Sequence, residues 1–155
     1  MTIHKKTTIT ETATLLFSML FLYTGISKLT DYLVFKEQIA ASPILESVAP
    51  LIATILPWME FIAVFLLLIP KWRLSGLYLS TILMMLFTAY ITAILIFSKD
   101  IPCSCGGIIA LLSWKQHLVF NSIFILLGIV GVTAENRLRK ENKTKLTAIN
   151  TNYVI

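Results

Sequence analysis

The chain has 155 residues, of which 57% are hydrophobic and only 14% are charged, and its mean hydropathy is +0.83. Because a soluble domain commonly has about a quarter of its residues charged, this composition excludes an ordinary soluble protein and favours a small integral membrane protein. The net charge of +5 lies largely in a basic C-terminal tail without interleaved aromatic residues, which is typical of an anchor beside anionic lipid, so no nucleic-acid partner is expected.

Four apolar runs approach or exceed the ~20 residues that a helix needs to cross a bilayer. They cover residues 13–34, 48–69, 74–97 and 117–134. No stretch alternates as the strands of a membrane barrel do. The sequence therefore predicts an all-α, four-helix transmembrane bundle in contact with the lipid bilayer. The first run is longer than a signal-peptide core and lacks a clear cleavage site, so we expect it to be kept as a helix.

The positive charges predict how the bundle is oriented. The excess of lysine and arginine marks the cytoplasmic side of a membrane protein. Nine of the thirteen basic residues fall in the tails 1–12 and 135–155 and in the turn after the second run. We therefore expect both termini in the cytoplasm and the loop 98–116 on the outer side.

Glu60 and Lys28 are ionisable residues within the predicted spans. Glu60 lies near the middle of the second helix, in "LPWMEF", where a charge costs about 3 kcal/mol unless it is paired or turned inward. The nearest candidate partner is Lys28, in "YTGISKL", whose long side chain can reach toward Glu60. Either the two form a structural pair that fixes helix packing, or Glu60 and Lys28 form a proton-handling or quinone-binding site. Gly25 beside Lys28 would allow a close helix approach in both cases.

Both cysteines of the chain lie in "IPCSCGGIIALLSW", residues 101–114. A structural zinc site needs more ligands than Cys103, Cys105 and His117 supply, so no metal is expected, although two thiolates can hold copper(I). Two buried thiols without a redox role are a further alternative. A disulfide across one residue is strained and readily reduced, which favours exchange. Gly106 and Gly107 would let a partner approach closely.

The start of the fourth helix adds a candidate acid or base. His117 and Asn121 are four residues apart and share a helix face. If that face turns inward, Asn121 can orient the imidazole, and His117 can exchange a proton with a reacting thiol. The alternative is an interfacial histidine and an asparagine that only packs helices. The helix N-terminus and the nearby Lys99 and Lys115 would favour a thiolate.

Taken together, these motifs resemble those of a known family of membrane proteins. A four-helix membrane protein with "LYTGISKL", "LPWMEF" and a Cys-x-Cys-x-Gly loop resembles the DoxX-like superfamily, and within it the methylamine-utilisation MauE family, over residues 13–134. The resemblance implies a redox-associated protein of the bacterial inner membrane, with the cysteine loop facing the periplasm. It also implies a thioredoxin-fold periplasmic partner in the maturation of exported proteins, with Cys103 and Cys105 as the exchanging pair. The link to methylamine metabolism is left open.

The predicted function is thus participation in thiol–disulfide exchange, as a component of an oxidoreductase system, with a quinone as one candidate cofactor. Two alternatives remain: a non-catalytic membrane scaffold or assembly factor, and a small transporter that uses Glu60. The sequence leaves the oligomeric state, including a homo-oligomer, open.

Overall fold

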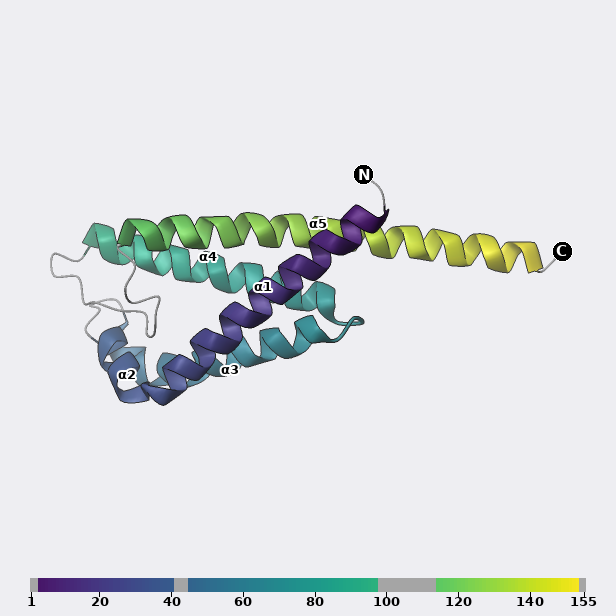
Figure 1. Ribbon diagram of the computed structural model, residues 1–155. Coiled ribbons are helices and arrows are strands. Elements are labelled where there is room, and N and C mark those ends of the chain that lie inside the picture. Colours follow the sequence, from purple (N-terminus) through teal and green to yellow (C-terminus); the bar gives the residue numbers. More distant parts are fainter. Residues whose placement is uncertain (1–2, 41–44, 98–113, 154–155) are drawn as a thin grey trace.

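The computed structural model of the protein describes residues 3–40, 45–97 and 114–153, and all regular structure in these ranges is helical (Figure 1). The long helices are α1 (Ile3–Thr30), α3 (Ala49–Leu68), α4 (Arg73–Phe97) and α5 (Trp114–Tyr153). The short helices α2 (Tyr32–Ala40) and η1 (Glu46–Val48) lie between α1 and α3. Four segments are long and apolar enough to cross a membrane: Lys5–Thr30, Glu46–Leu68, Arg73–Ala93 and Lys115–Ile149. The predicted all-α, four-span architecture is confirmed, and the chain is a multi-pass membrane protein.

The long helices form a closed bundle. α1 packs against α3 and α5, and α4 packs against the same two helices. The N-terminal end of α1, the turn between α3 and α4, and the C-terminal half of α5 lie toward one end (Figure 1). α2, the end of α4 and the start of α5 lie toward the other end. Both termini are therefore at one end of the bundle, as the predicted orientation requires, while the side of the membrane that this end faces remains a prediction.

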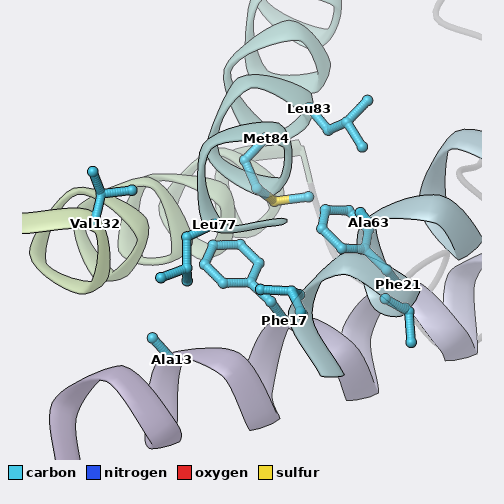
Figure 2. Close-up of a cluster of buried hydrophobic side chains, with 10 residues drawn as sticks. Ala13, Phe17, Phe21, Ala63, Leu77, Leu83, Met84 and Val132 are labelled. Atoms are coloured by element: carbon cyan, nitrogen blue, oxygen red, sulfur yellow. The ribbon is translucent and has the colours of Figure 1, made fainter. Parts of the chain in front are cut away.

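Aromatic and aliphatic side chains from all four long helices fill the middle of the bundle (Figure 2). Phe17 and Phe21 of α1 are fully buried, and the ring of Phe17 also meets Phe124 of α5 edge-on, with centroids 5.4 Å apart. Small residues bring the backbones close. A Cβ on Gly128 of α5 would lie 2.2 Å from Thr81 Oγ1 of α4, so only glycine fits at this crossing. Small residues at such contacts are typical of membrane helices.

The outer surface of the bundle is apolar. Large hydrophobic side chains such as Leu15, Met19, Leu51 and Leu126 are each more than half exposed. In water such a surface would be an interaction site or an aggregation hazard. On four helices of membrane-spanning length, it is the surface that contacts lipid.

The first and last long helices, α1 and α5, are longer than hydropathy predicts. α1 begins at Ile3, within the expected tail 1–12, and ends at Thr30 rather than near residue 34. The chain then restarts as α2 at Tyr32. α5 begins at Trp114, three residues before the expected start, and continues to Tyr153, so "TAINTNY", which the hydropathy pattern does not mark as helical, is the last part of this helix. These polar extensions remain helical because helix hydrogen bonds are made within the segment and do not require an apolar sequence.

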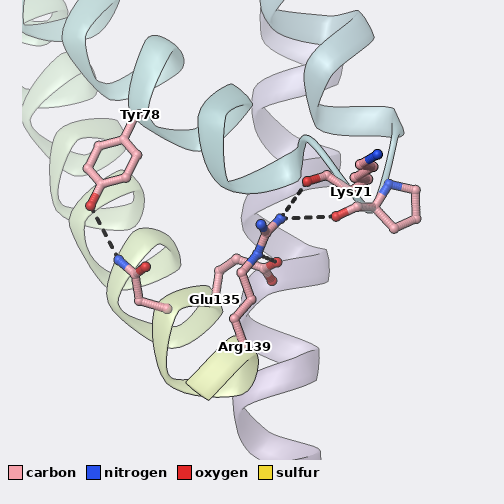
Figure 3. Close-up of polar contacts among 6 residues, drawn as sticks. Lys71, Tyr78, Glu135 and Arg139 are labelled. Atoms are coloured by element: carbon pink, nitrogen blue, oxygen red, sulfur yellow. Dashed lines mark hydrogen bonds and ion pairs between the residues drawn. The ribbon is translucent and has the colours of Figure 1, made fainter. Parts of the chain in front are cut away.

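Polar contacts join the helix extensions at the end of the bundle that carries the termini. Lys6 of α1 donates to Glu141 of α5. Arg139 pairs with Glu135, with Nε and Oε1 2.9 Å apart, and donates to the carbonyl oxygens of Pro70 and Lys71 at 3.2 and 2.9 Å (Figure 3). Arg139 thereby satisfies two carbonyls of the α3–α4 turn and fixes α5 to that turn.

Candidate functional site

A buried ion pair connects α1 and α3. Lys28 Nζ lies 2.6 Å from Glu60 Oε1, and the two residues are 8% and 0% exposed. The expected contact between these residues is therefore present. The Lys28 ammonium also lies 5.7 Å from the ring centroid of Phe35 and 5.5 Å from that of Phe87. A carboxylate oxygen and two aromatic faces thus surround the cation, and both kinds of contact stabilise a charge away from water.

The expected close approach at Gly25 is also present. A Cβ at this position would lie 3.1 Å from two ring carbons of Phe61 and 3.4 Å from Glu60 Oε2. The second carboxylate oxygen, Oε2, is buried and has no hydrogen-bond partner among the residues that the structure describes. The absence of a side chain on Gly25 therefore leaves room for α1 beside a carboxylate whose hydrogen-bonding capacity is only partly used.

A cavity of about 390 Å³ lies beside the ion pair and is lined by residues of α1, α2, α3, α4 and α5. Most of the lining is apolar, and it includes four aromatic residues, Phe35, Phe87, Tyr90 and Phe120. Glu60 and Lys28 form part of its wall. A mostly apolar cavity with a few convergent polar groups is the usual form of a small-molecule site.

His117 and Asn121 complete the polar part of this wall. They lie in the first two turns of α5, each is only 5% exposed, and both line the cavity. The shared face that their spacing predicts therefore turns into the bundle. The structure also brings this face to the cavity of the Lys28–Glu60 pair, which was not predicted, because the relative rotation of α1, α3 and α5 is not encoded in any local pattern.

The candidate residues of the loop lie outside the described residues. These are Cys103, Cys105, Gly106 and Gly107, in the segment 98–113. This segment connects the end of α4 at Phe97 to the start of α5 at Trp114. His117 and Asn121 follow Trp114 within two turns, so the cysteine segment is covalently attached at the end of the bundle where the cavity lies.

Sequence reasoning missed the aromatic residues of the cavity. Phe87 and Tyr90 of α4 line it, and Phe87 also contacts the Lys28 ammonium. In an apolar span these residues are indistinguishable from core or lipid-facing side chains. The one available signal is Lys28 itself. A lysine inside a span needs neighbours that stabilise its charge, and aromatic faces can stabilise a cation, but the sequence does not show which aromatic residues lie beside it.

The chain was compared with known proteins. The family described as Methylamine utilisation protein MauE has a model that matches residues 6–134, which cover most of α1, all of α3 and α4, the cysteine segment and the first half of α5. No match was found among curated proteins. No match was found among solved structures.

Proposed function

The chain belongs to the methylamine utilisation protein MauE family, and from this membership we propose that it takes part in thiol–disulfide exchange on the outer face of the bacterial cytoplasmic membrane. Cys103 and Cys105 are the exchanging pair, and a thioredoxin-fold protein outside the cytoplasm is the partner. The family links the chain to methylamine utilisation. Maturation of an exported, disulfide-containing protein is the role we propose within it.

The observation that carries the proposal is the polar end of the cavity. His117, Asn121 and the Lys28–Glu60 pair lie together at the end of the bundle to which the segment 98–113 is attached. Cys103 follows Phe97 by six residues. The segment that carries both thiols is thus attached at the end of the bundle where His117 lies.

The proposed chemistry is a balanced exchange. One thiolate attacks a sulfur of the partner disulfide, and the leaving partner thiolate takes up a proton. The second cysteine then attacks the mixed disulfide, which leaves a Cys103–Cys105 disulfide and a fully reduced partner. His117 accepts the proton of the attacking thiol, which raises the thiolate fraction. In the reverse direction a partner dithiol reduces the Cys103–Cys105 disulfide, so that the partner leaves with a disulfide and this chain with two thiols, and the same groups act.

Trapping tests the proposal. With Cys105→Ser, a mixed disulfide with a thioredoxin-fold protein should persist at Cys103 and be visible on a non-reducing gel as a band that a reductant removes. The wild-type chain should show it only transiently, since Cys105 resolves the bond. The variant lacking both cysteines is the matched control.

Maleimide labelling of the wild-type chain before and after mild reduction gives the second readout. We expect two thiols that become accessible only on reduction. If both cysteines stay free thiols under every oxidant and no mixed disulfide forms with either single variant, the chain does not exchange disulfides.

A further inference from the structure

We propose that the cavity beside the Lys28–Glu60 pair binds the ring of a lipid-soluble quinone, which accepts the electrons that disulfide formation releases. This inference rests on the proposed function in the direction in which a partner dithiol reduces the Cys103–Cys105 disulfide, because the quinone then accepts the electrons when that dithiol forms a disulfide again. The proposed binding site itself consists only of described residues, namely residues of α1 to α5 and Leu45, which precedes η1.

The size and lining of the cavity favour an apolar ligand with a planar ring. Its volume of about 390 Å³ lies within the range of small-molecule sites, about 300–1,000 Å³. Phe35, Phe87, Tyr90 and Phe120 contribute rings from three different helices. Aromatic side chains interact favourably with planar rings by offset stacking and by edge contacts.

The charges favour a neutral ligand over an ion. Lys28 and Glu60 neutralise each other across 2.6 Å, so the wall carries no net charge from this pair. An anionic or cationic ligand would have to displace one member of the pair and leave the other buried without a counter-ion. A neutral molecule can bind without this penalty.

The polar groups on the cavity wall match carbonyl oxygens. A lysine ammonium has three hydrogens, and an asparagine amide has two. One ammonium hydrogen of Lys28 is directed to Glu60 Oε1. Lys28, His117 and Asn121 all line the cavity, so a ligand carbonyl there meets hydrogen-bond donors from α1 and α5. A quinone is a neutral, planar ring with a carbonyl at each end.

The cavity is also placed so that a lipid-soluble ligand can enter it from the membrane. All the long helices that line it are membrane-spanning, and Leu86 of α4 both lines the cavity and is 59% exposed on the outer surface of the described bundle. The lining therefore reaches the surface that contacts lipid, where the apolar tail of a quinone can remain.

The redox step balances. A dithiol and a quinone give a disulfide and a quinol: two S–H bonds break, one S–S bond forms, and two electrons pass to the ring. The two thiol protons end on the two quinone oxygens, where O–H bonds form. His117 at the cavity wall is the group that relays protons from the thiol side.

Binding of two defined quinones to the full-length protein in lipid nanodiscs tests the inference. The probes are a benzoquinone with a ten-carbon tail and a naphthoquinone with one isoprene unit, each titrated by equilibrium binding and by the shift in thermal unfolding. Asn121→Leu keeps the branched shape of the side chain, with a larger volume, but removes the amide donor. We expect about tenfold weaker binding, the effect of losing one buried hydrogen bond. Ser122→Leu is the matched control, since Ser122 is exposed on the same turn of α5, and it should bind as the wild type does.

A second variant keeps the test valid if Asn121→Leu does not fold. Phe87→Trp keeps an aromatic ring but fills part of the cavity, and it should also weaken binding by about tenfold. Equal binding by wild type, Asn121→Leu and Phe87→Trp would mean that the quinones only partition into lipid, and would overturn the inference.

The variant without cysteines separates this inference from the proposed function. It should bind quinone as the wild type does but should not reduce it. If the wild type exchanges disulfides but binds neither quinone, the inference is wrong and the proposed function stands. If it binds quinone in the cavity but its cysteines never form a disulfide, the proposed function fails, and with it the role of the quinone as electron acceptor.

Discussion

Replacing Lys28 by methionine would test whether the buried ion pair stabilises the bundle. Lys28→Met keeps an unbranched side chain of similar length but removes the cation that pairs with Glu60. Glu60 is fully buried, so its carboxylate cannot turn to water without moving α3 or α1. The substitution therefore leaves either an unpaired buried charge or a carboxyl group that must take up a proton.

Two independent energy scales give a similar loss of stability for Lys28→Met. Removing one partner of a buried ion pair destabilises a protein by about 3–5 kcal/mol. Placing an acidic residue at the centre of a membrane helix costs about 2.5–3.5 kcal/mol on insertion scales. The loss of contact between the ammonium and the rings of Phe35 and Phe87 adds to this, by about 0.5–2 kcal/mol each. We expect Lys28→Met to lower the free energy of unfolding by about 3 kcal/mol or more.

Unfolding in mixed detergent micelles, followed by tryptophan fluorescence, measures the change. Lys115→Met removes an exposed lysine and serves as the matched control, with an effect within about 0.5 kcal/mol. The double variant Lys28→Met, Glu60→Gln should be more stable than Lys28→Met alone, because it leaves no buried charge. If Lys28→Met behaves like the control, or if the double variant is no more stable than the single one, the pair does not stabilise the fold as argued.

Three further predictions concern packing, the α5 contact and orientation. Gly128→Ala places a methyl group 2.2 Å from Thr81 Oγ1 and should destabilise the bundle by about 1–3 kcal/mol; Thr81→Ala should restore much of this in the same unfolding assay, and no rescue would contradict the steric argument. Arg139→Leu should cost about 0.5–1.5 kcal/mol and speed proteolysis at the turn 69–72, whereas the exposed Arg137→Leu should do neither. In a chain without its native cysteines, Lys115→Cys should react with an impermeant maleimide in intact cells and Arg137→Cys only after lysis; the reverse pattern would show that the orientation is inverted.

The spans and the central ion pair were predictable because lipid favours long apolar helices and disfavours an unpaired charge inside them. A run of about 20 apolar residues is costly in water and stable in lipid, so hydropathy finds it directly. A glutamate in the middle of such a run needs a partner, and few ionisable residues are available inside the spans. The choice of Lys28 for Glu60 is confirmed by the 2.6 Å contact. The spacing of His117 and Asn121 likewise predicts a shared face.

The cavity and the helix ends were not predictable for different reasons. The lining combines residues as far apart in sequence as Leu20 and Asn121, and their meeting depends on how the helices rotate against one another, which no local pattern records. Hydropathy identifies the residues that can be surrounded by lipid, but it does not identify the residue at which a helix ends. For this reason it does not find the polar end of α5, which continues to Tyr153. The roles of Cys103 and Cys105 remain predictions, since both lie outside the described residues.

The pairing of buried charges has a consequence for how the protein responds to voltage. Moving one elementary charge through 100 mV changes its energy by about 2.3 kcal/mol. The buried charged residues of the described chain are Lys6, Lys28, Glu60 and Glu135, and each contacts a group of opposite sign. A field does no net work on two opposite charges that move together. The interior of the bundle should therefore keep the same packing in energised and de-energised cells, and it can hold ionised groups without acting as a voltage sensor.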